Sequence, residues 1–166
     1  MASASCAYRA GKCHRRLPLP GADQSPNAAG VSTPPSFLAA SLYVALGGGF
    51  GAWLRYLVGT VWTRAIGAAT ASAFPWATLS VNVLGSLAMG LLAGWLARHG
   101  SHGEGWRLLL GVGVLGGITT FSAFSLELAL LVERGSLGTA LGYAAISLIA
   151  GLGGLFAGLA VMRAAI

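Results

Sequence analysis

The chain has very little charge for its length of 166 residues. Only 8% of the residues are Asp, Glu, Lys or Arg, with four acidic residues against ten basic ones and Lys12 as the only lysine. A soluble domain carries roughly 25% charged residues, so this set cannot build a water-facing surface. Most arginines stand at the edges of apolar runs, and nucleic-acid binding would need a clustered basic face. We therefore expect no nucleic-acid partner, and the arginines indicate a lipid membrane surface.

Residues for catalysis or metal binding are also scarce. Both cysteines, Cys6 and Cys13, lie near the N-terminus beside His14, which leaves a metal site one ligand short. We interpret them as unpaired thiols. The other histidines, His99 and His102, fall in a connector. Because no nucleophile has a base nearby and no phosphate-binding loop follows a strand, we predict that the protein is not an enzyme.

Long apolar runs are what the sequence has in abundance, and 55% of its residues are hydrophobic. A helix needs roughly 20 apolar residues to cross a bilayer. Four runs reach that length, at about 37–61, 76–97, 106–132 and 137–162. Tryptophans at 62, 76, 95 and 106 lie near their ends, as in an aromatic belt. The pattern predicts an all-α integral protein of the cell membrane with four transmembrane helices in residues 37–163.

The first 36 residues differ in composition from the rest. They are rich in Ser, Ala, Gly and Pro and contain no continuous apolar segment of the kind a signal peptide has. Residues 1–36 therefore indicate a disordered basic tail, or a start assigned too far upstream. Without this tail, three arginines on one side of the membrane face two on the other, which fixes no orientation.

Small residues recur at four-residue spacing in the second and fourth runs. The rows are Ser86, Gly90 and Gly94, and Ala150, Gly154 and Gly158. Such rows let helix backbones approach closely. Because four crossings leave little room for a central cavity, we expect some of these faces to serve an oligomer.

The third run contains a segment that is poorly suited to an uninterrupted helix, Gly116 to Ser125. It opens with two adjacent glycines and continues with Thr119 and Thr120. A helix break inside a bilayer is tolerated only where protein or water satisfies the freed backbone groups, and such breaks often mark ion or substrate sites. We predict that the third helix is broken in mid-membrane, with the glycine pair supplying the opening.

Polar and aromatic side chains cluster around this segment. Asn82, in the second run, either makes an interhelical hydrogen bond or belongs to a polar pathway, and the hydroxyls of the third run favour the pathway. Phe121 and Phe124 share a helix face. Their positive ring edges, together with the hydroxyls of Thr120, Ser122 and Ser125, could face a small anion without a full countercharge.

Four further residues are candidates with alternatives left open. Tyr143 and Ser147 either continue a hydroxyl track or are an interfacial tyrosine and a serine bonded to its own helix. Arg55 either snorkels to the interface or draws anions into a vestibule. Glu127 lies either at a pore mouth or in an ion pair with an arginine.

Three motifs resemble those of the Fluc (CrcB) family of fluoride channels. They are residues 47–56 (GGGFGAWLRY), 75–86 (PWATLSVNVLGS) and 116–127 (GGITTFSAFSLE), and the resemblance covers about 38–162. It implies an antiparallel, dual-topology homodimer, or a heterodimer with a similar chain, that exports cytoplasmic fluoride passively through two pores and so confers fluoride resistance.

The resemblance also implies roles for individual residues. Asn82, Phe121 and Phe124 would line the fluoride pore, and a polar track would start at Tyr143 and Ser147, although Ile149 and Gly153 further along lack hydroxyls. A structural sodium ion, which is not transported, would be held by the backbone carbonyls of Gly116 and Thr119. Ala123 stands where the family often has a hydroxyl residue.

Two other classes of protein fit four apolar spans. A small dual-topology four-helix secondary transporter would need a membrane-embedded acid early in the chain, where this sequence has Arg55, while Glu127 comes late. A structural or assembly subunit would not transport anything itself.

Overall fold

The computed structural model describes residues 8–9, 12–13, 35–99 and 103–165. The chain divides into two units, Met1–Val31 and Ser32–Ile166. In the first unit, β1 (Tyr8–Arg9) pairs antiparallel with β2 (Lys12–Cys13). The rest of the predicted tail, apart from Pro35 and Ser36, lies outside the described residues, as do Cys6, His14 and His102.

The first long helix of the second unit, α1 (Phe37–Ile66), begins and ends at recognisable signals. The Ser36 hydroxyl accepts a hydrogen bond from the Ala39 N–H at 3.3 Å, and Gly67 follows the helix with φ +81°. An N-terminal serine cap and a glycine in the left-handed region are the usual ends of a helix. The six-residue helix α2 (Ala68–Ala73) then leads into α3 (Trp76–His99).

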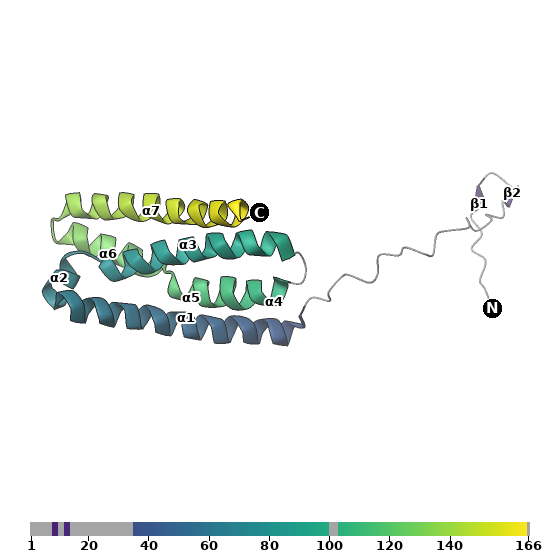
Figure 1. Ribbon diagram of the computed structural model, residues 1–166, viewed down its shortest axis with the longest axis horizontal. Coiled ribbons are helices and arrows are strands. Elements are labelled where there is room, and N and C mark those ends of the chain that lie inside the picture. Colours follow the sequence, from purple (N-terminus) through teal and green to yellow (C-terminus); the bar gives the residue numbers. More distant parts are fainter. Residues whose placement is uncertain (1–7, 10–11, 14–34, 100–102, 166) are drawn as a thin grey trace. The chain divides into compact units, whose positions relative to one another are not determined.

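The last helix, α7 (Leu137–Ala164), follows α6 (Phe121–Glu133) after a tight turn. Gly135 has φ +74° and donates to the Val132 carbonyl, while the Ser136 N–H donates to the Leu131 carbonyl, both at 2.9 Å. This Schellman arrangement satisfies the last carbonyls of α6 and reverses the chain, so α6 and α7 lie side by side (Figure 1).

The third membrane-length stretch is built from four pieces. The short α4 (Glu104–Trp106) continues into η2 (Arg107–Leu115), a π-helical segment, then α5 (Gly116–Ile118) and, after Thr119 and Thr120, α6. The backbone at Thr119 (ψ 153°) and Thr120 (ψ 128°) is extended and separates α5 from α6. The expectation that the glycine pair opens the helix was wrong, because Gly116 is helical with φ −65° and ψ −33°.

Glycines on α1 and on this stretch, Gly117 among them, allow the two to pack closely. A Cβ added at Gly47 would collide with the Leu109 carbonyl, one at Gly51 with the Val114 carbonyl, and one at Gly117 with the Gly48 carbonyl. Backbone therefore lies directly on backbone along α1, η2 and α5, as small residues allow in membrane helices.

The small-residue rows of α3 and α7 also face each other within one chain. A Cβ at Gly90 would collide with the Leu155 carbonyl, and one at Gly158 with the Leu87 carbonyl, while Gly94 and Gly154 are similarly close to the partner helix. These rows account for the extensive contact between α3 and α7. The glycines of these rows are packed inside one chain, so their contacts do not test the oligomer expected from the sequence, which stays a prediction.

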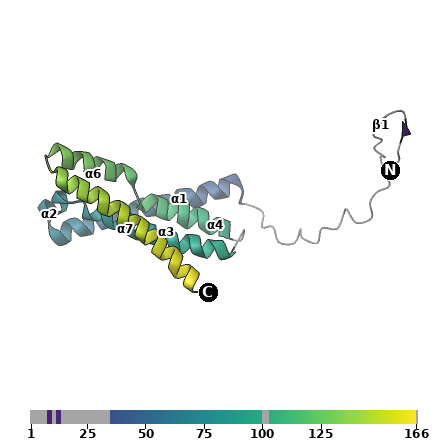
Figure 2. The same cartoon turned by 90° about the horizontal axis from the view of Figure 1, so that it is seen from above.

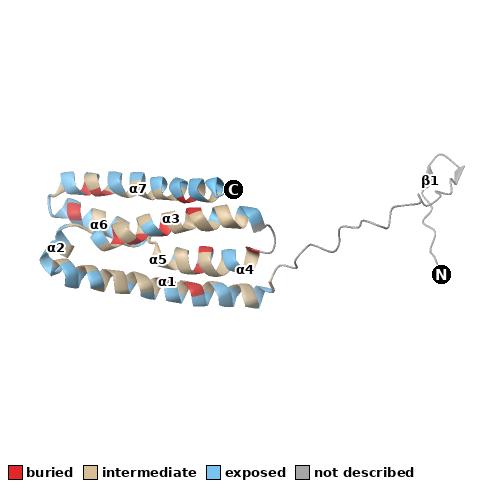
Figure 3. Ribbon diagram, viewed as in Figure 1, coloured by how far each residue is buried: buried red, intermediate tan, exposed pale blue. Residues whose placement is uncertain are grey.

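The all-α fold with four spans is confirmed. Four stretches are long and apolar enough to cross a membrane: Phe37–Ile66, Trp76–Arg98, Glu104–Glu133 and Leu137–Ala164. They run side by side (Figures 1 and 2), and the third changes neighbours along its length, with η2 and α5 against α1 and α6 against α7. Few residues are buried (Figure 3), and many large apolar side chains are exposed, as expected of a bundle whose solvent is lipid.

Candidate functional site

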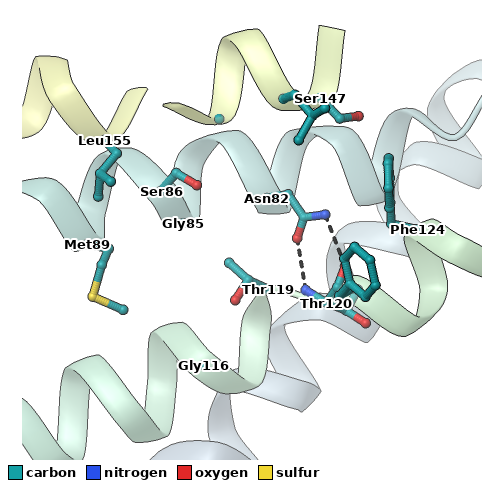
Figure 4. Close-up of a pocket in the computed structure, with 13 residues that line it drawn as sticks. Asn82, Gly85, Ser86, Met89, Gly116, Thr119, Thr120, Phe124, Ser147 and Leu155 are labelled. Carbon is teal, nitrogen blue, oxygen red and sulfur yellow. Dashed lines mark hydrogen bonds between the residues drawn. The ribbon is translucent and has the colours of Figure 1, made fainter. Parts of the chain in front are cut away.

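The interruption of the third span opens onto a cavity of about 610 Å³ between α3, α5, α6 and α7. Figure 4 shows the residues that line it. They are Asn82, Gly85, Ser86, Met89, Gly116, Thr119, Thr120, Phe121, Phe124, Ser147, Leu148, Gly151 and Leu155. None of these described residues is charged. The cavity thus combines an amide, hydroxyls and two phenyl rings with an apolar wall.

Asn82 fixes the interruption by pairing with both backbone groups of one residue. Its Nδ2 donates to the Thr120 carbonyl at 3.1 Å, and its Oδ1 accepts from the Thr120 N–H at 2.9 Å (Figure 4). Because a carbonyl can only accept and an N–H can only donate, these two bonds also settle which amide atom is which. The interhelical hydrogen bond considered from the sequence is therefore present, and it is made to backbone. One Asn82 N–H keeps no partner among the described residues.

These two hydrogen bonds, here called the Asn82 clamp, change the hydrogen-bond partners of neighbouring backbone N–H groups. In a continuous helix the Thr120 N–H would bond the Gly116 carbonyl, but here it bonds Asn82. The Thr119 carbonyl would accept from the Ala123 N–H, which instead donates to the Thr120 hydroxyl at 3.3 Å. Gly116 and Thr119 thus lose the helical donors of their carbonyls, and both residues border the cavity.

The two phenylalanines lie together but in different surroundings. Their ring centroids are 5.8 Å apart. Phe124 also contacts the fully buried Tyr143 at 5.1 Å, whereas Phe121 is 80% exposed. Phe124 is therefore anchored inside the monomer, while Phe121 forms an open wall of the cavity.

The hydroxyl residues predicted to line the pore differ in where they lie: some line the cavity, and others bond neighbouring groups of their own segment. Ser147 lines the cavity, and its buried Oγ has no hydrogen-bond partner among the described residues. Ser125 donates to the Phe121 carbonyl of its own helix at 2.9 Å, and Ser122 lies 3.2 Å from the Thr120 hydroxyl. Ser122 and Ser125 are exposed and do not line this cavity.

Glu127 lies in a separate polar cluster. Its carboxylate accepts from the Thr78 hydroxyl at 2.6 Å and from the Tyr143 hydroxyl at 2.8 Å. It also borders two further cavities of about 520 and 190 Å³, the larger of which includes Arg64 in its lining. Within residues 35–99 and 103–165, no ion pair joins Glu127 to an arginine. Two hydroxyl donors hold this carboxylate in place instead.

Comparisons with known proteins identify the family. The model for the CrcB-like protein, Camphor Resistance (CrcB), matches residues 42–159. The chain belongs to the CrcB family. The resemblance seen in the three sequence motifs is thereby confirmed.

Three similar proteins are each named as a fluoride-specific ion channel. FluC of Novosphingobium aromaticivorans is 59% identical over 126 residues, which are 76% of this chain and 98% of the relative. FluC of Rhodospirillum centenum is 54% identical over 125 residues (75% and 96%). FluC 2 of Nitrobacter hamburgensis is 52% identical over 122 residues (74% and 95%). All three are named as channels, which agrees with the expectation that this chain is not an enzyme.

Arg55 is not brought to the site in this CrcB-family chain. It is half-buried on α1, makes no hydrogen bond or ion pair with another described residue, and does not line the cavities described above. Its predicted vestibule role stays a prediction.

Two residues of the site were missed by sequence reasoning. Thr78 is buried and bonds Glu127, and Ser86 lines the central cavity. Both lie four residues from Asn82 on α3, so they share its helix face. That spacing could have identified them.

Proposed function

We propose that the protein is a fluoride channel that lets cytoplasmic fluoride leave the cell passively and thereby confers fluoride resistance. The observation that carries this proposal is the uncharged cavity at the interruption of the third span, which the Asn82 amide and two phenyl rings line. The Ser86 and Ser147 hydroxyls also line it and have no hydrogen-bond partner among the described residues. Membership of the CrcB family and relatives that are named as fluoride-specific channels support it.

The lining suits a small anion that must pass quickly. Amide and hydroxyl protons and the positive edges of phenyl rings can replace part of the hydration shell of fluoride. A lysine or arginine in the lining would bind the anion more tightly, and conduction needs easy release as well as easy entry. Asn82, Thr120, Phe121, Phe124 and Ser147 are the proposed pore residues, and Glu127 with Tyr143 lies beside their path.

We further propose that two antiparallel copies form the working channel, with the interruption near the bilayer midplane. The central cavity is open and Phe121 is 80% exposed, so a second chain is needed to enclose a pore. Without the N-terminal tail, the three-to-two balance of arginines allows insertion in both orientations. Ser136→Cys in a background without Cys6 and Cys13 should be labelled from both sides of the membrane, and purely one-sided labelling would contradict this arrangement.

A structural sodium ion fits the same interruption. Hard cations prefer oxygen ligands, and the Gly116 and Thr119 carbonyls have lost their helical donors. The ion would supply positive charge to carbonyls that are otherwise costly to bury in a membrane. A ligand that binds the folded state stabilises it, so the assembled protein should unfold at a higher temperature in sodium than in N-methylglucammonium at equal ionic strength. Equal midpoints would argue against the ion.

Fluoride efflux from proteoliposomes tests the proposed function. Vesicles loaded with potassium fluoride should release fluoride when a potassium ionophore balances charge, and vesicles loaded with potassium chloride should release little chloride. An absence of fluoride release from well-assembled protein would overturn the proposal. Release that requires a proton gradient would favour a secondary transporter, and no flux of either kind would favour an assembly subunit.

A further inference from the structure

Ser86 is a cavity residue whose hydroxyl has no assigned role. It follows Asn82 by four residues on α3, so both side chains lie on one helix face, and both line the central cavity (Figure 4). No hydrogen bond joins the Ser86 hydroxyl to another described residue, although serines within helices commonly bond their own backbone. Its proton is therefore available to a ligand in the cavity.

The opposite wall of the cavity provides space at this point. A Cβ built on Gly151 of α7 would lie 3.7 Å from the Ser86 Oγ and would meet no other atom within 4 Å beyond its own helix. From Leu148 to Ala164, α7 carries no hydroxyl residue. Beyond Ser147, a polar path along the cavity therefore cannot continue on α7, and Ser86 supplies the hydroxyl from α3.

A second observation points to a ligand in the same cavity. The Ser147 Oγ is buried without a hydrogen-bond partner among the described residues, and one N–H of the half-buried Asn82 amide has no partner there either. Buried polar groups in proteins are nearly always paired, so an unpaired one needs an explanation. An anion that accepts hydrogen bonds from these groups would supply it.

We propose that Ser86 is a specificity-determining residue of the anion path, and that its hydroxyl donates to the dehydrated anion on the Gly151 side of Asn82. This inference rests on the proposed fluoride channel function. The hydroxyl lowers the barrier for fluoride more than for chloride, because the smaller anion loses more hydration energy and gains more from a short hydrogen bond.

The first test compares Ser86→Ala with the parent in fluoride efflux at matched reconstitution. A hydrogen bond to a charged group contributes enough to change the initial efflux rate by about tenfold, so we expect that loss. Ser41→Ala, an equal change at an exposed position of α1, is the control and should conduct like the parent. Both variants should elute with the parent in size-exclusion chromatography. If the parent conducts and Ser86→Ala matches it, the role of Ser86 is wrong while the channel function stands.

The second test moves the hydroxyl from α3 to α7. Gly151→Ser in the Ser86→Ala background places a hydroxyl beside the lost one without a backbone collision. We expect it to recover most of the fluoride rate and of the fluoride-to-chloride ratio. A structural defect would not respond in this way. Failure to recover either quantity in a well-assembled double variant would overturn the proposal, and an inactive parent would instead refute the channel function.

Discussion

The two halves of the third span differ in how they are held. Before the interruption, η2 and α5 lie against α1 through glycine backbone, with no side chain between the Gly117 and Gly48 positions. After it, α6 lies against α7 through side chains, with Phe124 against Tyr143 and Glu127 bonded to the Tyr143 hydroxyl. Close backbone packing along α1 makes the first half a support for the rest of the span. The second half carries the chemical groups.

The interruption allows one span to pack against α1 in its first half and to present chemical groups beside α7 in its second half. Two extended residues, Thr119 and Thr120, let the chain leave α1 and continue along α7. The Asn82 side chain takes over the backbone bonds that a helix would have made at Thr120. The site therefore depends on the glycine contacts between α1 and the first half of the third span, and on the two hydrogen bonds of Asn82 to Thr120. Each of these can be removed separately by substitution.

Asn82→Asp should have the largest effect, because it removes the hydrogen bond from Asn82 to the Thr120 carbonyl and adds charge. A carboxylate cannot donate to the Thr120 carbonyl and would repel an anion in a cavity whose described lining has no cation. The lost hydrogen bond and the repulsion of the anion both raise the barrier to conduction. We therefore expect fluoride efflux to fall by about 100-fold or more. Efflux near the parental rate from a well-assembled variant would show that Asn82 does not contribute to the fluoride pathway.

Gly51→Ala should disrupt the packing of η2 against α1 and so destabilise the first half of the third span. The new Cβ would collide with the Val114 carbonyl, and backbone atoms cannot move aside as a flexible side chain can. Overpacking of this kind costs about 1–3 kcal/mol, so the thermal midpoint and the yield of monodisperse protein should fall. Gly49→Ala is the matched control, because a Cβ there meets nothing within 4 Å. Equal stability of the two variants would show that the glycine contact is unimportant.

Phe121→Ile and Phe124→Ile should separate conduction from packing. Each change removes a ring edge while keeping an apolar side chain, and we expect fluoride efflux to fall by about tenfold in both. Only Phe124→Ile should also lower the thermal midpoint, since Phe124 contacts Tyr143 and Phe121 is exposed. If both variants show the parental rate of efflux, the two phenylalanines contribute only to packing and not to conduction.

Ser125→Ala should have the smallest effect. Its hydroxyl donates to the Phe121 carbonyl on an exposed face and does not reach the central cavity. We expect fluoride efflux within about twofold of the parent, because such local bonds contribute little. A loss as large as that of the phenylalanine variants would return Ser125 to the pore, as the sequence predicted.

The sequence predicted the spans well because hydropathy measures what a bilayer selects. The predicted starts at Phe37, Trp76 and Leu137 coincide with those of α1, α3 and α7. The predicted ends fall short, with α1 reaching Ile66 rather than Val61, because a helix can continue past the apolar segment until a residue such as Gly67 stops it. The π-helical η2 gave no signal, since its hydropathy matches that of an α-helix.

The sequence predicted some of the residues that line the cavity but not their hydrogen bonds. The polar and aromatic residues stood out against an apolar background, and Asn82, Thr120, Phe121, Phe124 and Ser147 do line one cavity. The location of the opening could not be predicted, because glycine freedom suggested Gly116 and Gly117, whereas both stay helical and Gly117 lies against Gly48 of α1. That Asn82 bonds the Thr120 backbone follows only from how α3 lies against the third span.

An experimental structure of the protein in lipid with sodium fluoride would test the central claim most directly, by the backbone density at residues 116–123. We expect extended backbone at Thr119 and Thr120, Asn82 bonded to both backbone groups of Thr120, and density beside the Gly116 and Thr119 carbonyls. A continuous helix through Gly116–Thr120, with Asn82 turned away and no density there, would contradict it.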